Sequence, residues 1–353
     1  MALSLTSIAA PQGDQERAVL DGVPRIGYDV HLCPLPGSLC SVMEYLGDPC
    51  DYDYLMGVTG ACFRRLFNRD DGGNVDLMYL APEPYERASR ALGYELRALA
   101  RVDRAEMIRE IKESIGRGRP VLAFGIIGPP ECGIIAGYDQ GGEVMIGYSY
   151  FQEDSHQGYY ETPDWYGTKP GEGLAGLLIV GDKDPQAIPP QRGLLISSLE
   201  WAIELARSPE RPNIKDHASG LAAYEAWAAA LEVDADYPPD DPQVMDVRAM
   251  VHGDQCVMLE ERHCAASYLR QMMAVAGEAA EELGAAAALY DEVANAGSLT
   301  WPWPGPDRTL GMKGLADPNA RREIARAVRE AAEREAEAVA HVEAALKILT
   351  AGQ

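Results

Sequence analysis

A cysteine near the start of an apolar stretch is the first candidate for chemistry. Gly37–Gly47 reads Gly-Ser-Leu-Cys-Ser-Val-Met-Glu-Tyr-Leu-Gly, which predicts a short helix with Ser38 as its N-cap and Cys40 in its first turn. The backbone N–H groups and the helix dipole favour a thiolate there and lower its pKa. We therefore predict Cys40 as a nucleophile. The alternative is a small buried cysteine on an amphipathic helix.

A nucleophilic cysteine needs a base that accepts its proton, and two side chains are candidates. Glu131 precedes a predicted strand, where a partly buried carboxylate has a raised pKa and can act as a weak general base. Glu131 would equally suit the binding of an amine. His156 lies in a polar loop and could reach Cys40, with a solvated loop histidine as the alternative. His31 is expected to be structural.

Four further residues are candidates for contact with a substrate. Cys132 opens the predicted strand, and Tyr148 and Tyr150 belong to a run of aromatic residues that could stack on a flat or sugar-like ligand. Cys62 lies between two apolar residues and is a second candidate thiol. Packing of a loop onto the sheet is the alternative for the tyrosines, and packing in the core is the alternative for Cys62.

One predicted helix carries side chains of the types that ligate metals. His252, Cys256, Glu260 and Cys264 follow one another at four-residue steps, which places them on one helix face. Two or three of them could contribute to a zinc site. All four spread over about 18 Å of helix and cannot reach one ion. A mixed face inside a helical bundle is the favoured alternative, so we assign no metal site and expect no cofactor.

Composition argues against several classes of partner. The 353 residues carry a net charge of −24, and nucleic acid and anionic membranes both need a basic surface. No run of about 18 apolar residues predicts a membrane span. Residues 1–12 lack the basic start and apolar core of a secretory signal, and the seven cysteines form no CxxC pair. We expect a cytoplasmic protein with reduced thiols and a small-molecule or acyl-carrier substrate.

The order of the predicted elements indicates two domains. Helices in the first part are followed by strands at 120–127, 133–138, 143–150 and 174–180, the middle two forming a hairpin, which indicates an α+β domain over 1–185. The proline-rich segment 182–193 marks the boundary. Residues 193–353 have helical periodicity, including a long helical pattern over 243–277, and predict an α-helical bundle that could form a homodimer.

Parts of the chain resemble the N-terminal domain of the butirosin biosynthesis protein H family, which has a papain-like cysteine-peptidase fold. The similar stretches are 37–46, 55–64, 119–122, 134–139, 220–227 and 262–269. The resemblance implies acyl transfer or amide cleavage, with Cys40 in the nucleophile's position. The chain departs from the family pattern where the strand should open with His and has Glu131-Cys132. The next strand reads Gly147-Tyr148-Ser149-Tyr150 without an orienting Asp or Asn, and the upstream Gln is missing.

Two functions stay open at this point. The first is cysteine-dependent acyl transfer or amide-bond chemistry on a small-molecule or carrier-bound acyl substrate, with Cys40 as nucleophile and Glu131 or His156 as base. The alternative is a catalytically degenerate papain-like fold that binds a small molecule or peptide, or acts as a helical interaction protein. A similar fold alone does not distinguish these two functions, because one fold can carry many unrelated activities.

Overall fold

The chain forms two compact units. The computed structural model describes residues 16–71, 82–152, 157–167, 173–297 and 308–351. The first unit consists of Met1–Asp51 with Leu77–Ile188, and the second of Tyr52–Asp76 with Pro189–Gln353. This division differs from a single boundary near residues 185–193, because residues 52–76 group with the helical part of the chain. The reason is a set of contacts that residues 52–67 make with the helices and the strand β9 of that part.

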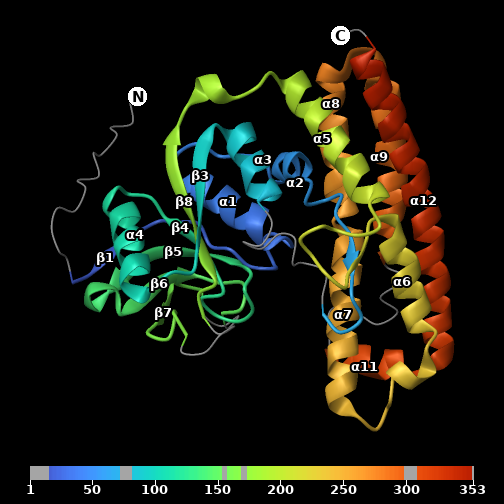
Figure 1. Ribbon diagram of the computed structural model, residues 1–353, viewed down its shortest axis with the longest axis horizontal. Helices are drawn as coiled ribbons and strands as arrows, with labels where there is room; N and C mark the ends of the chain where they lie inside the picture. The colour runs from blue at the N-terminus through green and yellow to red at the C-terminus, as the bar shows by residue number, and fades with distance from the viewer. Residues whose placement is uncertain (1–15, 72–81, 153–156, 168–172, 298–307, 352–353) are drawn as a thin grey trace. The chain divides into compact units, whose positions relative to one another are not determined.

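In its described residues, the first unit combines a sheet with α-helices (Figure 1). Its helices are α1 (Pro34–Tyr45), α3 (Glu83–Leu92) and α4 (Arg104–Gly116). Its strands are β1 (Ala18–Val19), β3 (Tyr94–Ala100), β4 (Val121–Phe124), β5 (Cys132–Asp139), β6 (Val144–Tyr148), β7 (Tyr160–Thr162) and β8 (Gly176–Lys183). The four predicted strands correspond to β4, β5, β6 and β8.

The sheet is antiparallel, in the order β3-β8-β4-β5-β6-β7. Strand β1 pairs with β5 at Gly137 and Tyr138, beyond the residues that pair with β4. The predicted β5–β6 hairpin is confirmed, and its turn contains Gly141 and Gly142 at positive φ. A bulge in β5 opposes Gly147, where a Cβ atom would lie 1.9 Å from the carbonyl oxygen of Ile134, so this position accepts only glycine.

Strand β5 lies at the centre of this unit. Its residues from Cys132 to Tyr138 are all buried, and both α1 and α4 pack against it. A strand covered on both faces is expected to be apolar along its whole length, and Gly-Ile-Ile-Ala-Gly fits that expectation. Helix α1 is therefore fixed against the start of β5, which determines what its side chains meet.

The described part of the second unit consists mainly of helices and includes one short strand pair. Its helices are α2 (Tyr52–Thr59), α5 (Gln191–Arg207), α6 (Leu221–Leu231), α7 (Pro242–Glu260), α8 (Arg262–Ala276), α9 (Ala280–Asn295), α11 (Arg308–Ala316) and α12 (Pro318–Thr350). The helical pattern predicted over 243–277 is confirmed, and it is divided between two helices, because α7 ends and α8 begins around Glu261. Glu261 is buried there and pairs with Arg64, so its side chain faces the interior of the unit.

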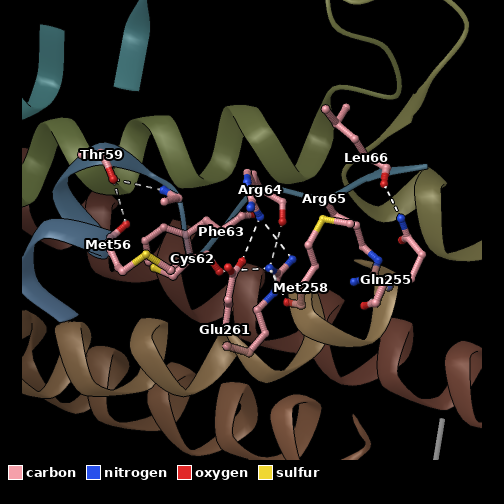
Figure 2. Close-up of polar contacts among 12 residues, drawn as sticks. Met56, Thr59, Cys62, Phe63, Arg64, Arg65, Leu66, Gln255, Met258 and Glu261 are labelled. Atoms are coloured by element: carbon pink, nitrogen blue, oxygen red, sulfur yellow. Dashed lines mark hydrogen bonds and ion pairs between the residues drawn. The ribbon is translucent and has the colours of Figure 1, made fainter. Parts of the chain in front are cut away.

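Residues from Tyr52 onward enter the core of this helical unit. Helix α2 packs on α5 and α8, and a Cβ atom at Gly57 would lie 2.0 Å from the Tyr268 ring. The short strand β2 (Leu66–Phe67) pairs with β9 (Ala218–Ser219). Figure 2 shows the connecting segment beside α7 and α8, with the Gln255 amide donating to the Leu66 carbonyl at 2.7 Å. These contacts explain why the segment belongs to the helical unit.

The fold is therefore mixed α+β, with an antiparallel sheet and a helical C-terminal region, as the sequence predicts at that level. Within the described ranges, none of the helices has the length and apolar character that crossing a membrane requires.

Candidate functional site

Helix α1 begins five residues earlier than the sequence suggested. Its N-cap is Cys33 and its first residue is Pro34, so Cys40 lies in the second turn. Proline suits the first position of a helix because its fixed φ is already helical and its missing N–H is not needed there. Ser38 is not the N-cap: it is buried inside the helix and its hydroxyl donates to the Cys132 carbonyl at 3.1 Å. The prediction that Cys40 lies in the first turn is wrong.

The Cys40 thiol instead faces a second cysteine. The Sγ atoms of Cys40 and Cys50 lie 3.2 Å apart, within hydrogen-bond distance for sulfur, and both thiols are free. Cys40 is buried, with 8% of its surface exposed, whereas Cys50 is partly exposed. The residues next to Cys50 in the sequence indicate no role for it. A spacing of ten residues carries no familiar motif, so no sequence signal pointed to this pair.

The end of α1 explains how Cys50 comes back to Cys40. Gly47 has φ of 78°, and its N–H donates to the Glu44 carbonyl at 3.0 Å. The next N–H, of Asp48, donates to the Met43 carbonyl at 3.0 Å. This pair of bonds is a Schellman motif, which reverses the chain after a helix and favours glycine at its left-handed position. The reversal brings residue 50 alongside the helix that it has just left.

The two thiols differ in acidity. The hydrogen bond to Cys50, burial and the nearby Asp51 and Glu44 carboxylates raise the pKa of Cys40. The same contact lowers the pKa of Cys50, because the Cys40 thiol can donate to an ionised Cys50, against the opposing effects of burial and the Asp48 and Asp51 carboxylates. Cys50 is therefore the member of the pair that ionises first, and Cys40 is the member that stabilises the resulting thiolate.

Glu131 and His156 are the two predicted bases for Cys40. Glu131 accepts a hydrogen bond from the Tyr28 hydroxyl at 3.0 Å, and its charge acts on Cys132 and Tyr150. The carboxylates that act most strongly on the Cys40 thiol are Asp51 and Glu44. His156 lies outside the described residues.

The start of α1 carries a group of side chains that the sequence analysis did not bring together. Cys33, the helix N-cap, is fully buried. The Tyr150 hydroxyl lies against the helix, because a Cβ atom on Gly37 would be 2.2 Å from it and 3.0 Å from the His31 Cβ. Burial, Cys33 and Cys132 raise the pKa of Tyr150. Proline directly after a cysteine was the available signal, since proline at the first helical position marks the preceding residue as N-cap.

The remaining predicted residues fall in two places. Cys132 is buried at the start of β5, and burial raises its pKa. The Tyr150 ring packs edge-on against Tyr28 at 5.0 Å, and Tyr148 packs against Tyr159 at 4.7 Å, so both tyrosines take part in aromatic packing. Cys62 belongs to the helical unit, where it is fully buried and burial raises its pKa.

The spaced histidine and cysteine residues of α7 and α8 do not form a metal cluster. No group of three or more His, Cys, Asp and Glu side chains in the described part of the chain is arranged to hold a metal ion. His252 and Cys256 do approach each other, with Nε2 and Sγ 3.5 Å apart. His263 instead lies 3.3 Å from the Asp291 carboxylate.

Comparison with known proteins adds no assignment, because no protein-family model and no curated protein matches the chain. Among the described residues of the first unit, the Cys40–Cys50 pair combines a sulfur–sulfur contact with a partly exposed member.

Proposed function

We propose that the α+β unit carries out thiol–disulfide exchange through Cys50 and Cys40. The 3.2 Å contact between the two Sγ atoms carries this proposal. A disulfide has an S–S bond of about 2.0 Å, so a small movement of two free thiols already in contact would allow the bond to form. Such an exchange needs one accessible thiol with a lowered pKa and a second thiol beside it. Cys50 is partly exposed and has a lowered pKa, whereas Cys40 is buried and has a raised pKa.

The exchange has two steps. The Cys50 thiolate attacks one sulfur of a substrate disulfide, which forms a mixed disulfide and releases the other half of the substrate as a thiolate. Cys40 then loses its proton and attacks Cys50 Sγ, which forms the Cys40–Cys50 disulfide and releases the second half. The two protein thiols are oxidised and the substrate disulfide is reduced to two thiols, so electrons and atoms balance.

Charge near the pair favours one class of disulfide. Glu44, Asp48 and Asp51 lie close enough to influence the two thiols. Lys183 offsets part of this charge because it forms an ion pair with Asp48. A net negative environment attracts cationic disulfides and repels anionic ones. Aminothiol disulfides such as cystamine are therefore the proposed substrates, ahead of glutathione disulfide.

The test follows oxidation of the reduced protein by cystamine with peptide mass spectrometry. We expect a Cys40–Cys50 disulfide in the wild type, and a mixed disulfide that persists on Cys50 in Cys40→Ala. Cystamine should react faster than glutathione disulfide, and added salt should narrow the difference. The Cys264→Ala variant, which removes a part-exposed thiol of the other unit, should behave like the wild type. A Cys50 that reacts no faster than Cys264 would refute the proposal.

The pH dependence gives an independent readout. Because the Cys40 thiol lowers the pKa of Cys50, Cys50 holds more thiolate at neutral pH than an ordinary thiol does. Cys40→Ala removes this hydrogen bond, so the profile of Cys50 alkylation against pH should shift to higher pH. An unchanged profile would show that the contact has no effect on reactivity.

The second candidate is the acyl transfer or amide-bond chemistry that the family resemblance implies for a papain-like fold. It was assigned to Cys40, with Glu131 or His156 as base. The position of Cys33 favours it in a modified form, because this cysteine caps the helix that packs on β5. Incubation with a thioester acyl donor, followed by mapping of the acylated residue, tests it. Acyl groups on Cys33 or Cys40 would support this function, and acylation of neither residue would dismiss it.

A further inference from the structure

The ammonium group of Lys183 reaches the segment that carries Cys50. Lys183 is the last residue of β8 and forms an ion pair with the Asp48 carboxylate. The backbone of Asp48 is held as well, because its N–H donates to the Met43 carbonyl in the last turn of α1. Asp48 is therefore tied both to the helix that contains Cys40 and to the sheet, and Cys50 follows two residues later.

An aromatic ring on the neighbouring strand helps to fix this ammonium group. Lys183 is opposite Tyr94 of β3 in the antiparallel register, and its Nζ lies 5.4 Å from the centre of the Tyr94 ring. The face of an aromatic ring attracts a cation at this distance. The side chains of Lys183 and Asp48 are 32% and 39% exposed, so solvent reaches the ion pair. The pair therefore has a defined position, and solvent and salt weaken it.

The charged groups around the two thiols are mostly acidic. The groups that act on the thiol pair or on the ion pair are Cys40 and Glu44 of α1, Asp48 and Asp51 after it, Tyr94 of β3 and Lys183 of β8. The contact with Cys40 lowers the pKa of Cys50, whereas burial and the Asp48 and Asp51 carboxylates raise it. A carboxylate near a thiol disfavours the thiolate, and a cation paired with that carboxylate offsets the effect. Loss of the Lys183 charge should therefore make Cys50 harder to ionise.

We propose that Lys183 is a positioning residue of this thiol pair, a role that rests on the proposed thiol–disulfide exchange. By neutralising Asp48, Lys183 keeps Cys50 reactive and limits the preference of the site for cationic disulfides. Lys183 thus regulates the site through Asp48, and the two exchange steps are unchanged. Because salt screens the ion pair, ionic strength alters both the reactivity and the preference.

Alkylation of Cys50 by iodoacetamide, an uncharged reagent, tests the effect on reactivity in the reduced full-length protein. Lys183→Gln should slow the reaction at pH 7 about threefold and move its pH profile to higher pH by about half a unit. Lys183→Arg keeps the charge and should restore the wild-type profile. Arg97→Gln is the matched control and should leave the profile unchanged, because Arg97 lies on β3 of the same unit and pairs with a different carboxylate, Glu110. A Lys183→Gln profile equal to that of the wild type would overturn the proposal.

An Asp48→Asn background separates action through Asp48 from a direct effect or a loss of structure. In this background Lys183→Gln should hardly change the alkylation of Cys50, because the carboxylate that Lys183 neutralises is gone. Thermal melts check that the single and double variants are folded. An equal loss of reactivity in both backgrounds would overturn the proposed route through Asp48.

Exchange with two disulfides of opposite charge tests the effect on substrate preference. Lys183→Gln should raise the ratio of the cystamine rate to the glutathione disulfide rate about threefold at low salt, and high salt should remove the difference. A ratio equal to that of the wild type at low salt would overturn the proposed effect on preference. If wild-type Cys50 reacts with neither disulfide, the proposed exchange itself fails, whereas the alkylation profiles still show whether Lys183 acts on the thiol.

Discussion

The cost of removing Arg262 is the stability prediction that the structure defines best. Arg262 is fully buried and donates to both carboxylate oxygens of Glu335, at 2.8 and 2.9 Å. It also donates to the carbonyls of Cys62, Arg64 and Met258, at 3.0, 2.9 and 3.1 Å. One side chain therefore neutralises a buried carboxylate and holds the segment that joins α2 to β2.

Arg262→Met should destabilise the protein by about 4–6 kcal/mol. Breaking a buried ion pair from one side costs about 3–5 kcal/mol, and leaving a buried carbonyl without a donor adds about 1 kcal/mol. The sum is a large part of a typical total stability of about 5–15 kcal/mol. The double variant Arg262→Met with Glu335→Leu removes both charges, and should lose about 2 kcal/mol less than Arg262→Met alone.

Urea denaturation followed by circular dichroism measures these differences. Arg329→Met is the control, since Arg329 also pairs with two carboxylates, Glu225 and Glu232, but on an exposed surface. An exposed pair contributes about 0–1 kcal/mol, so the control should stay close to the wild type. If Arg262→Met costs no more than Arg329→Met, the buried network does not stabilise the helical unit as argued.

Three smaller predictions concern other buried contacts. Gly57→Ala should lower the urea midpoint, because a Cβ atom 2.0 Å from the Tyr268 ring forces a repacking that costs about 1–3 kcal/mol. An unchanged midpoint would contradict this close approach. Ser38→Ala should cost about 1 kcal/mol through loss of the bond to the Cys132 carbonyl, and no loss would show that the bond is unimportant. Burial raises the pKa of Glu260, so Glu260→Gln should raise the melting temperature at pH 7. That advantage should disappear below about pH 4, where the wild-type carboxyl is protonated in both states, and its persistence there would contradict the assignment.

Strands β4, β5, β6 and β8 were predictable because each has a continuous apolar or alternating pattern and turn residues near its ends. The β5–β6 hairpin follows from Gln140-Gly141-Gly142, where positive φ is required. The start of α1 was missed because Pro34 and Pro36 resemble a turn when read alone. In the structure, they are the first and third residues of the helix. Proline breaks a helix interior but suits its first turn, and local sequence does not reveal which position applies.

The pairing of Cys40 with Cys50 depends on three-dimensional detail that the sequence does not show. Gly47 was predicted to end the helix, but not to reverse the chain back along it. The buried ion pairs of the helical unit were likewise not predictable from the sequence. Arg64, Glu261 and Arg262 look like solvated charges in the sequence, because charged side chains are rarely buried unless they are paired. Their partners come from distant parts of the chain, so the pairing became evident only in the folded unit.

The most direct test of the central claim is the equilibrium between the reduced and oxidised Cys40–Cys50 pair. The fully reduced protein is equilibrated in buffers with graded ratios of cysteamine to cystamine, quenched with acid and mapped by peptide mass spectrometry. We predict that one disulfide forms, that it joins Cys40 to Cys50, and that Cys50→Ala and Cys40→Ala each abolish it. If the thiols stay reduced in the folded protein or either cysteine pairs elsewhere, the proposed thiol–disulfide exchange is wrong.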